Sequence, residues 1–202
     1  MKKLLFVNAC MRAGSRTEML AREYLRRAFP RDEFAVQEVP VAALDIQPLS
    51  GDDVAARDAD IAAGRTDTPP YALARDFAQA DEIVVAAPFW DAAFPAKLKV
   101  YLEHICVRSV TFGYRPDGSL ARLCRAPRLT YITTAGGPLR AVPAVRLLWE
   151  ELCAMFAIGD LRFYCADGLD TDPAAAEAKL ESTLRAMLAD RRESGEGRGE
   201  ER

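Results

Sequence analysis

The feature that most constrains the fold of this chain is an unbroken apolar run, IVVAA, at residues 83–87. A strand with one face in water alternates apolar and polar side chains, whereas a strand covered by helices on both faces is apolar throughout. The run therefore predicts a central strand of a parallel sheet. Pro95 follows soon after and fits the first turn of a helix, where the fixed φ and the missing N–H of proline cost nothing.

The rest of the chain repeats this alternation of strand and helix patterns. Besides residues 83–87, strands are expected at 3–7, 34–39, 129–133 and 161–165, and helices at 15–29, 52–63, 71–79, 95–104, 144–156 and 173–192. With right-handed crossovers, this order predicts an α/β fold: a flavodoxin-like, doubly wound, five-stranded parallel sheet of order 2-1-3-4-5, with helices on both faces. Residues 110–114 are expected to form a short extended piece that ends at the turn signal of residues 116–118.

The composition is that of an ordinary globular protein. The chain has 202 residues, of which 50% are hydrophobic, and a net charge of −3. We expect one domain over residues 1–192 and a disordered polar tail at 193–202. No basic stripe suggests a nucleic acid partner, and no apolar run approaches the roughly 20 residues that a membrane span needs.

The cysteine and histidine content bounds the compartment and the metal chemistry. The five cysteines are an odd number without a CxxC pair, which favours reduced thiols and a cytoplasmic location. His104 is the one histidine of the sequence, so a histidine-rich metal site is excluded and no metal is predicted.

Three loops that follow strands are expected to meet, because the carboxyl ends of parallel strands lie at one edge of the sheet, where open α/β sheets bind ligands. The first loop places hydroxyls of Ser15 and Thr17 at the start of a helix, whose N–H groups favour an anion. Arg12 and Arg16 add positive charge. The loop thus predicts a phosphate cradle, although Ser15 also fits the simpler role of a helix cap. The sequence lacks GxxxxGK[ST] and GxGxxG, which argues against a Walker loop and a dinucleotide-binding domain.

The other two loops add an aromatic surface and a glycine pair. Residues 89–94 read FWDAAF and suit a planar ring, although aromatic residues at strand ends are more often part of the core. Residues 133–138 read TTAGGP. Their two glycines permit close approach of the backbone to a ligand, or they form a simple turn. The joint placement of the three loops is what favours a ligand site.

These motifs resemble those of the NAD(P)H-dependent quinone reductases and azoreductases, a family of flavodoxin-like flavoproteins. That family has a Ser/Thr-rich loop after its first strand, which residues 10–17 match. It also has a Pro-x-aromatic loop followed by Pro-Ala-x-Leu-Lys, matched at residues 88–92 and 95–99, and a Thr/Ser-x-Gly-Gly loop, matched at 134–137. VTFGY at 110–114 resembles a further stretch, and the similarity extends to about residue 190.

The resemblance implies a cofactor, a reaction and an assembly. FMN, with FAD less favoured, would take a hydride from NAD(P)H and pass electrons to quinones, azo compounds or similar small electrophiles. The implied cofactor-binding residues are Cys10, Arg12, Ser15, Arg16, Thr17, Pro88, Phe89, Trp90, Asp91, Ala92, Thr134, Ala135, Gly136 and Gly137. No side chain is assigned a catalytic role, because the flavin N5 carries the chemistry. The resemblance also implies a homodimer whose second subunit walls the pocket. A flavodoxin-type electron carrier and a flavin-free binding domain are the alternatives.

Several residues depart from the family pattern or invite a functional interpretation. Cys10 stands where many members have serine, and Asp91 where many have asparagine. Asp91 is expected either beside the flavin N5 edge or as a cap of the helix that starts at Pro95. Cys10 is interpreted as a small buried residue, His104 as a packed or interface residue, and Trp149 as part of the core. Residues 51–60 are interpreted as a solvated helix face rather than a partner surface.

Overall fold

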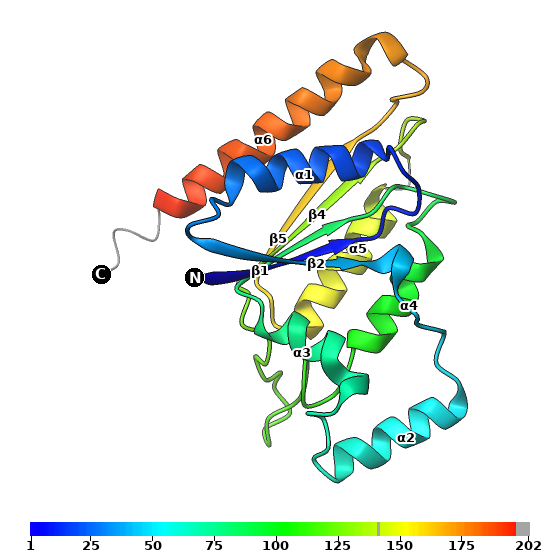
Figure 1. Ribbon diagram of the computed structural model, residues 1–202, viewed down its shortest axis with the longest axis vertical. Coiled ribbons are helices and arrows are strands. Elements are labelled where there is room, and N and C mark those ends of the chain that lie inside the picture. The colour runs from blue at the N-terminus through cyan, green and yellow to red at the C-terminus, as the bar shows by residue number, and fades with distance from the viewer. Residues whose placement is uncertain (141, 197–202) are drawn as a thin grey trace.

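The computed structural model describes residues 1–140 and 142–196 of the chain. Its five strands are β1 (Lys2–Asn8), β2 (Phe34–Pro40), β3 (Glu82–Ala86), β4 (Arg128–Thr134) and β5 (Asp160–Ala166). They form one parallel sheet of order β2-β1-β3-β4-β5 (Figure 1). The predicted α/β fold, strand order and orientation are therefore confirmed.

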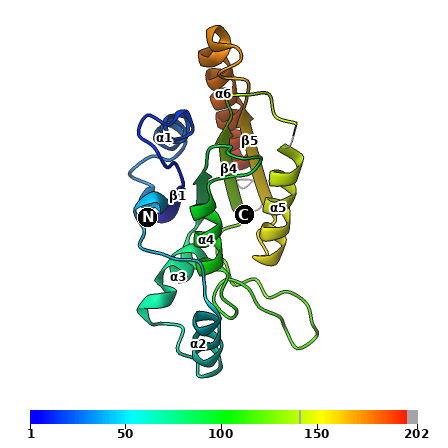
Figure 2. The ribbon, with the colours of Figure 1, turned by 90° about the vertical axis from the view of Figure 1, so that its right-hand side faces the viewer.

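The helices cover both faces of the sheet, because alternate side chains of each strand point to opposite faces. The covering helices are α1 (Arg16–Ala28), α3 (Ala72–Gln79), α4 (Ala96–Ile105), α5 (Val142–Met155) and α6 (Ala176–Glu196), whereas α2 (Gly51–Ala62) lies away from the sheet. Leu4 and Phe6 of β1 pack into a cluster with α1 and α6, whereas Leu5 and Val7 pack into a second cluster with α3, α4 and α5. Figures 1 and 2 show α1 and α6 together on one side of the sheet. The continuous apolar run of β3 follows from this double cover, and β3 is buried throughout.

Two boundaries differ from the sequence prediction. The last helix continues to Glu196, so residues 193–196 of the expected disordered tail are helical, and the remainder of that tail lies outside the described residues. The end of the helix is anchored because Arg191 donates to Glu82 at 2.7 Å and stacks on the ring of Phe29.

The expected extended piece at 110–114 is not a strand. It belongs to a connection between α4 and β4 that contains isolated bridges, Arg108 with Phe112 and Tyr114 with Leu120. Thr111 is buried and its hydroxyl donates to the carbonyl of Ile105 at 2.6 Å, which curls the segment back onto the end of α4. The turn signal at 116–118 is confirmed, since the Gly118 N–H donates to the Arg115 carbonyl.

Helix α2 lies apart from the two apolar clusters, near the lower end of the molecule in Figure 1. None of its residues is buried. Ser50 and Asp53 form a capping box at its start, and Arg57 donates to the carbonyls of Glu103 and Cys106 at the end of α4. Asp60 also accepts from the Tyr71 hydroxyl at 2.9 Å, and Ile61 packs against a small buried cluster that contains Tyr71. Most other residues of α2 are exposed, as the interpretation of residues 51–60 as a solvated face expects.

Candidate functional site

The three loops that follow β1, β3 and β4 do meet at the carboxyl edge of the sheet. They enclose a cavity of about 180 Å³. Ten of the fourteen predicted site residues line it: Arg12, Ser15, Arg16, Thr17, Pro88, Phe89, Trp90, Thr134, Ala135 and Gly136. Asp170, from the loop between β5 and α6, lines it as well.

The first turn of α1 forms one wall of the cavity. Ser15 is the N-cap of this helix, and its hydroxyl accepts from the Glu18 N–H at 3.5 Å. The first N–H groups of a helix lack partners within the helix and carry positive partial charge. Ser15 therefore serves as a cap, and the same helix start directs N–H groups toward the cavity.

Two threonines tie this helix to the third loop. The hydroxyls of Thr17 and Thr134 lie 2.7 Å apart, and both residues are buried. Thr134 is the last residue of β4, so this hydrogen bond fixes the start of α1 to the end of a central strand. The floor of the cavity is consequently held by the sheet rather than by loops alone.

The two arginines of the first loop occupy different environments. Arg12 is exposed at the cavity mouth. Arg16 reaches to the loop after β5, where it donates to the Leu169 carbonyl at 3.1 Å and forms an ion pair with the Asp170 carboxylate. The positive charge of Arg16 is thus already paired within the chain.

The aromatic loop is a tight turn with left-handed backbone at its tip. Asp91 has φ 49° and Ala92 has φ 62°, and Trp90 and Ala93 exchange backbone hydrogen bonds of 2.8 and 3.2 Å. This is the pattern of a type I′ turn, which glycine and asparagine favour. The turn holds Trp90 at the cavity while Asp91 and Ala92 project into water.

The left-handed backbone at Ala92 should lower the stability of the protein. We expect Ala92→Gly to stabilise the protein by up to about 1 kcal/mol, because release of left-handed strain, about 1–2 kcal/mol, exceeds the entropy that glycine costs. The matched control is Ala93→Gly, which has no such strain and should destabilise by about 0.5–1 kcal/mol. The urea concentrations at the unfolding midpoints of the two variants test this prediction. Equal destabilisation by both substitutions would show that the backbone at Ala92 is not strained.

The glycines of the third loop do not have equivalent surroundings. A Cβ added at Gly136 would lie 2.8 Å from the Cγ of Asp170, whereas a Cβ added at Gly137 would meet nothing within 4 Å. The Gly136 carbonyl also accepts from the Asp170 N–H at 2.8 Å. The close approach expected at the glycine pair is therefore real, but the group that approaches Gly136 is a carboxylate of this chain.

Four predicted site residues do not line the cavity: Cys10, Asp91, Ala92 and Gly137. Cys10 is buried behind the first loop, where its N–H donates to the Asn8 side chain. Burial raises the pKa of its thiol to about 11, so it is protonated at neutral pH and is a poor nucleophile. Asp91 does not cap the following helix either, because that helix has no side-chain cap.

The other residues considered from the sequence have structural surroundings. His104 bonds through Nε2 to the Gln47 carbonyl at 2.9 Å and thereby holds the segment before α2 against α4. Trp149 is fully buried and packs against Tyr131 with ring centroids 4.9 Å apart. Both positions agree with the interpretation of packed residues.

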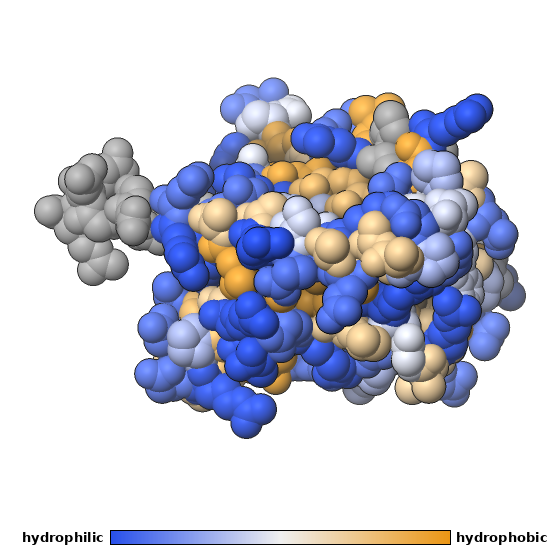
Figure 3. Space-filling model, turned by 90° about the horizontal axis from the view of Figure 1, so that it is seen from above, coloured by the Kyte–Doolittle hydropathy of each residue, from blue (hydrophilic) through white to orange (hydrophobic). Residues whose placement is uncertain are grey.

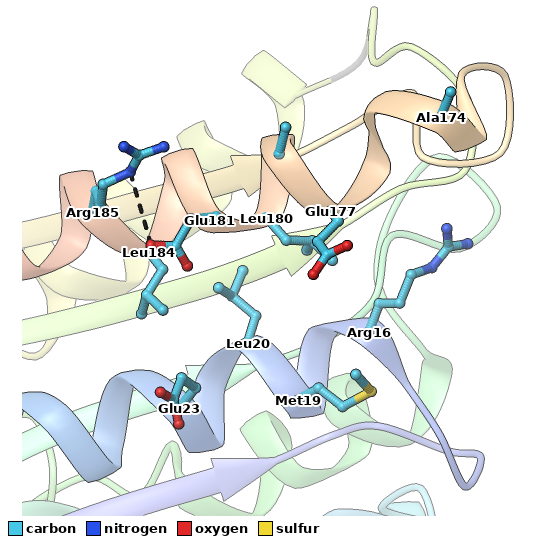
Figure 4. Close-up of a pocket in the computed structure, with 11 residues that line it drawn as sticks. Arg16, Met19, Leu20, Glu23, Ala174, Glu177, Leu180, Glu181, Leu184 and Arg185 are labelled. Carbon is cyan, nitrogen blue, oxygen red and sulfur yellow. Dashed lines mark ion pairs between the residues drawn. The ribbon is translucent and has the colours of Figure 1, made fainter.

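A larger depression of about 840 Å³ lies between α1 and α6. Figure 3, which looks onto these helices, shows apolar residues in a band between hydrophilic ones. In Figure 4, Leu20, Leu180 and Leu184 lie between the two helices, and Glu177 and Glu181 project from α6. It lies along helix flanks rather than at the ends of strands, and Arg16 alone is shared with the three-loop cavity. We therefore place the functional site at the smaller cavity.

Two further features of the described residues concern metal binding and membrane insertion. Over residues 1–140 and 142–196, no group of three or more His, Cys, Asp or Glu side chains is arranged to hold a metal ion. In the same ranges, none of the helices has the length and apolar character needed to cross a membrane.

Sequence comparison places the chain among known proteins. Residues 2–190 match the family described as Flavodoxin-like fold. The FMN-dependent NADH:quinone oxidoreductase of Azotobacter vinelandii is 30% identical over 179 residues, which are 84% of this chain and 89% of that protein. The FMN-dependent NADH:quinone oxidoreductase 2 of Clostridium acetobutylicum is 33% identical over 116 residues, which are 55% of this chain and span 58% of that relative's length.

Structure comparison agrees on the fold. An azoreductase from Bacillus anthracis superposes with a TM-score of 0.76 over 95% of this chain and 99% of that one, at 20% sequence identity. The match covers nearly the whole chain, so this chain shares its overall fold with that protein.

Proposed function

Because this chain belongs to the flavodoxin-like fold family, and within it to the FMN-dependent NADH:quinone oxidoreductases, we propose that it is an FMN-dependent NAD(P)H oxidoreductase. Its acceptors are quinones, azo compounds or similar small electrophiles. The observation that carries this proposal is the convergence, in one cavity, of a helix start with hydroxyls and arginines beside Phe89 and Trp90. The names of the relatives indicate that the cofactor is FMN, and the cavity has groups that suit FMN.

The residues of the cavity fit the phosphate end of FMN. Ser15 offers a hydroxyl, the start of α1 offers N–H groups, and the exposed Arg12 at the mouth is placed to pair with an anion. The hydroxyls of Thr17 and Thr134 bond to each other and fix the start of α1 beside the cavity. A phosphate bound there would sit over the positive end of the helix dipole. With the phosphate held by these donors, the flavin ring would lie on the side of the cavity formed by Phe89 and Trp90.

FMN supplies the hydride and electron transfer when bound, and the task of the protein is to bind and orient it. The tip of the aromatic turn suits this task, because its own hydrogen bonds join Trp90 and Ala93 and leave the N–H groups of Asp91 and Ala92 outside them. We propose that these N–H groups, with those of Gly136 and Gly137, face the polar edge of the ring. Donors at that edge stabilise the charge that the ring gains on reduction.

Steady-state kinetics with protein from which a chaotropic salt has first removed any bound flavin test the proposal. We expect NADH or NADPH oxidation with a quinone or an azo dye to require added FMN. Double-reciprocal plots should give the parallel lines of a ping-pong mechanism. Initial rates with each nucleotide alone reveal which of the two is preferred. Protein that binds FMN but does not oxidise either nucleotide would instead be an electron carrier, and protein that ignores FMN would contradict the proposal.

We also propose that the protein is a cytoplasmic homodimer. All five cysteines are free thiols, which is typical of a reducing compartment. A cavity of about 180 Å³ is smaller than the roughly 300–1,000 Å³ of typical ligand sites, so the ring needs a further wall. Helix α4, which begins directly after the aromatic loop, suits this contact. Residues 105–114 lie at the far end of α4 beside α2 and are less suited to it.

The assembly makes a separate prediction. We expect light scattering to give the mass of a dimer at micromolar concentration, and Ala96→Arg, at the exposed first turn of α4, to shift the protein toward the monomer and release FMN. A charged side chain in a subunit contact is costly because it must lose water. A monomeric wild-type protein with full FMN retention and activity would contradict the dimer.

A further inference from the structure

Among the described residues that line the cavity, Asp170 alone was not suggested by the sequence, and it lies beside the proposed phosphate end. The residue follows β5, in a loop whose backbone pairs with the third loop: the N–H groups of Leu169 and Asp170 donate to the carbonyls of Ala135 and Gly136. These bonds hold the position of the Asp170 backbone relative to the sheet. Its carboxylate is thereby directed at Gly136 and at the guanidinium of Arg16.

The carboxylate occupies a space that exists only because residue 136 is glycine. A Cβ at this position would come within 2.8 Å of Asp170 Cγ and closer still to its Oδ2. The absence of that Cβ lets a negative group rest against the backbone of the third loop, directly beside the first turn of α1. An anion that enters the cavity therefore meets Asp170 as well as the donors.

Arg16 is the link between the carboxylate and the cradle. It is the first residue of α1, and its two terminal guanidinium nitrogens donate to the Leu169 carbonyl and to the Asp170 carboxylate. Arg16 borders both the cavity and the groove between α1 and α6. A guanidinium has five N–H donors, so a phosphate that pairs with Arg16 either shares this side chain with Asp170 or displaces it.

We propose that Asp170 sets how strongly this site prefers the phosphorylated flavin over unphosphorylated riboflavin. It lowers the affinity for FMN in two ways: it holds Arg16 in an internal ion pair, and it places a negative charge beside the phosphate. The ring and the ribityl chain carry no net charge, so riboflavin is indifferent to Asp170. This inference rests on the proposed binding of FMN in the three-loop cavity.

The size of the effect of Asp170 on FMN affinity depends on how exposed the two charged side chains are. The Asp170 side chain is 67% exposed and the Arg16 side chain 30% exposed, so water screens their interaction with a phosphate. We therefore expect a change of about tenfold in FMN affinity when the charge is removed, rather than the much larger change of a buried pair. The sign is a gain, because both effects of the carboxylate oppose the phosphate.

The test measures dissociation constants for FMN and for riboflavin by quenching of flavin fluorescence. Asp170→Asn keeps the size of the side chain, and Asp58→Asn, on the exposed surface of α2, is the control that removes an equal charge far from the cavity. We expect Asp170→Asn to raise the ratio of the riboflavin constant to the FMN constant about tenfold, and Asp58→Asn to leave it unchanged. An unchanged or lowered ratio in Asp170→Asn, in a protein with a native circular dichroism spectrum, overturns the inference.

The same substitution in a protein that lacks the Arg16 charge distinguishes the effect through Arg16 from direct repulsion of the phosphate. In Arg16→Gln, the gain from Asp170→Asn should shrink to less than about threefold, because no ion pair remains to be released. A full tenfold gain there overturns the part of the proposal that acts through Arg16. Wild-type protein that binds neither flavin overturns the proposed function and this inference together, whereas wild-type protein that binds and uses FMN with an unaffected ratio overturns the inference alone.

Discussion

An aspartate at position 15 should abolish tight binding of FMN while it leaves the fold intact. Aspartate caps a helix as well as serine does, so Ser15→Asp keeps the hydrogen bond that the Glu18 N–H makes at the start of α1. The new charge, however, would stand inside the proposed phosphate cradle. A unit charge about 5 Å from another, at an effective dielectric of about 20, acts with about 3 kcal/mol, which is a loss of at least a hundredfold in affinity.

The matched control is Ser15→Asn, which is also a good helix cap but carries no charge. It should bind FMN within a few-fold of wild type, and neither variant should lose affinity for riboflavin. Flavin fluorescence titrations give the affinities, and thermal unfolding confirms the fold. Equal FMN affinity in the aspartate and asparagine variants would place the phosphate elsewhere.

Removal of the Trp149 side chain should have the largest effect on stability. Trp149 is fully buried, packs against Tyr131 and lies 6.4 Å from Phe94, measured between ring centroids. Truncation of such a residue to alanine leaves a cavity and costs about 3–5 kcal/mol, a large part of the total stability of a domain. Because Phe94 ends the aromatic loop, Trp149→Ala should also loosen the loop and weaken FMN binding.

The control for this change is Leu147→Ala on the same helix. Leu147 is 56% exposed, so its loss should cost less than about 1 kcal/mol. Urea unfolding of both variants gives the comparison. A cost for Trp149→Ala as small as that of Leu147→Ala would show that the aromatic cluster contributes little to the core.

The fold was predictable because its signals are local and strong. The apolar run of β3 required helices on both sides of the sheet, and the serine at position 15 marked the start of α1, where the structure has its N-cap. The parallel order then required the three loops to meet at one edge. The ends of elements were less well determined, because the last turns of α6 are held by a contact between Arg191 and Glu82 that are far apart in sequence.

The sequence predicted the features of the site that one loop carries by itself, but not the contacts between loops. Sequence motifs placed ten residues at the cavity, but they gave no sign of Asp170, whose role depends on the glycine at position 136 and on Arg16. The hydrogen bond between Thr17 and Thr134 is likewise a product of the folded sheet. The side chains of Asp91 and Ala92 face water because they lie in a left-handed turn, which the sequence hides because it has no glycine there.

The central claim is that this chain binds FMN and passes electrons from a nicotinamide nucleotide to a small acceptor. Anaerobic titration of the FMN-loaded, gel-filtered protein with NADH or NADPH tests it most directly, with the visible flavin absorbance as the readout. The account predicts that one equivalent of one of these nucleotides per bound FMN bleaches the flavin, and that a quinone added without oxygen restores the colour. Flavin that is lost on gel filtration, or that stays oxidised with both nucleotides, would contradict it.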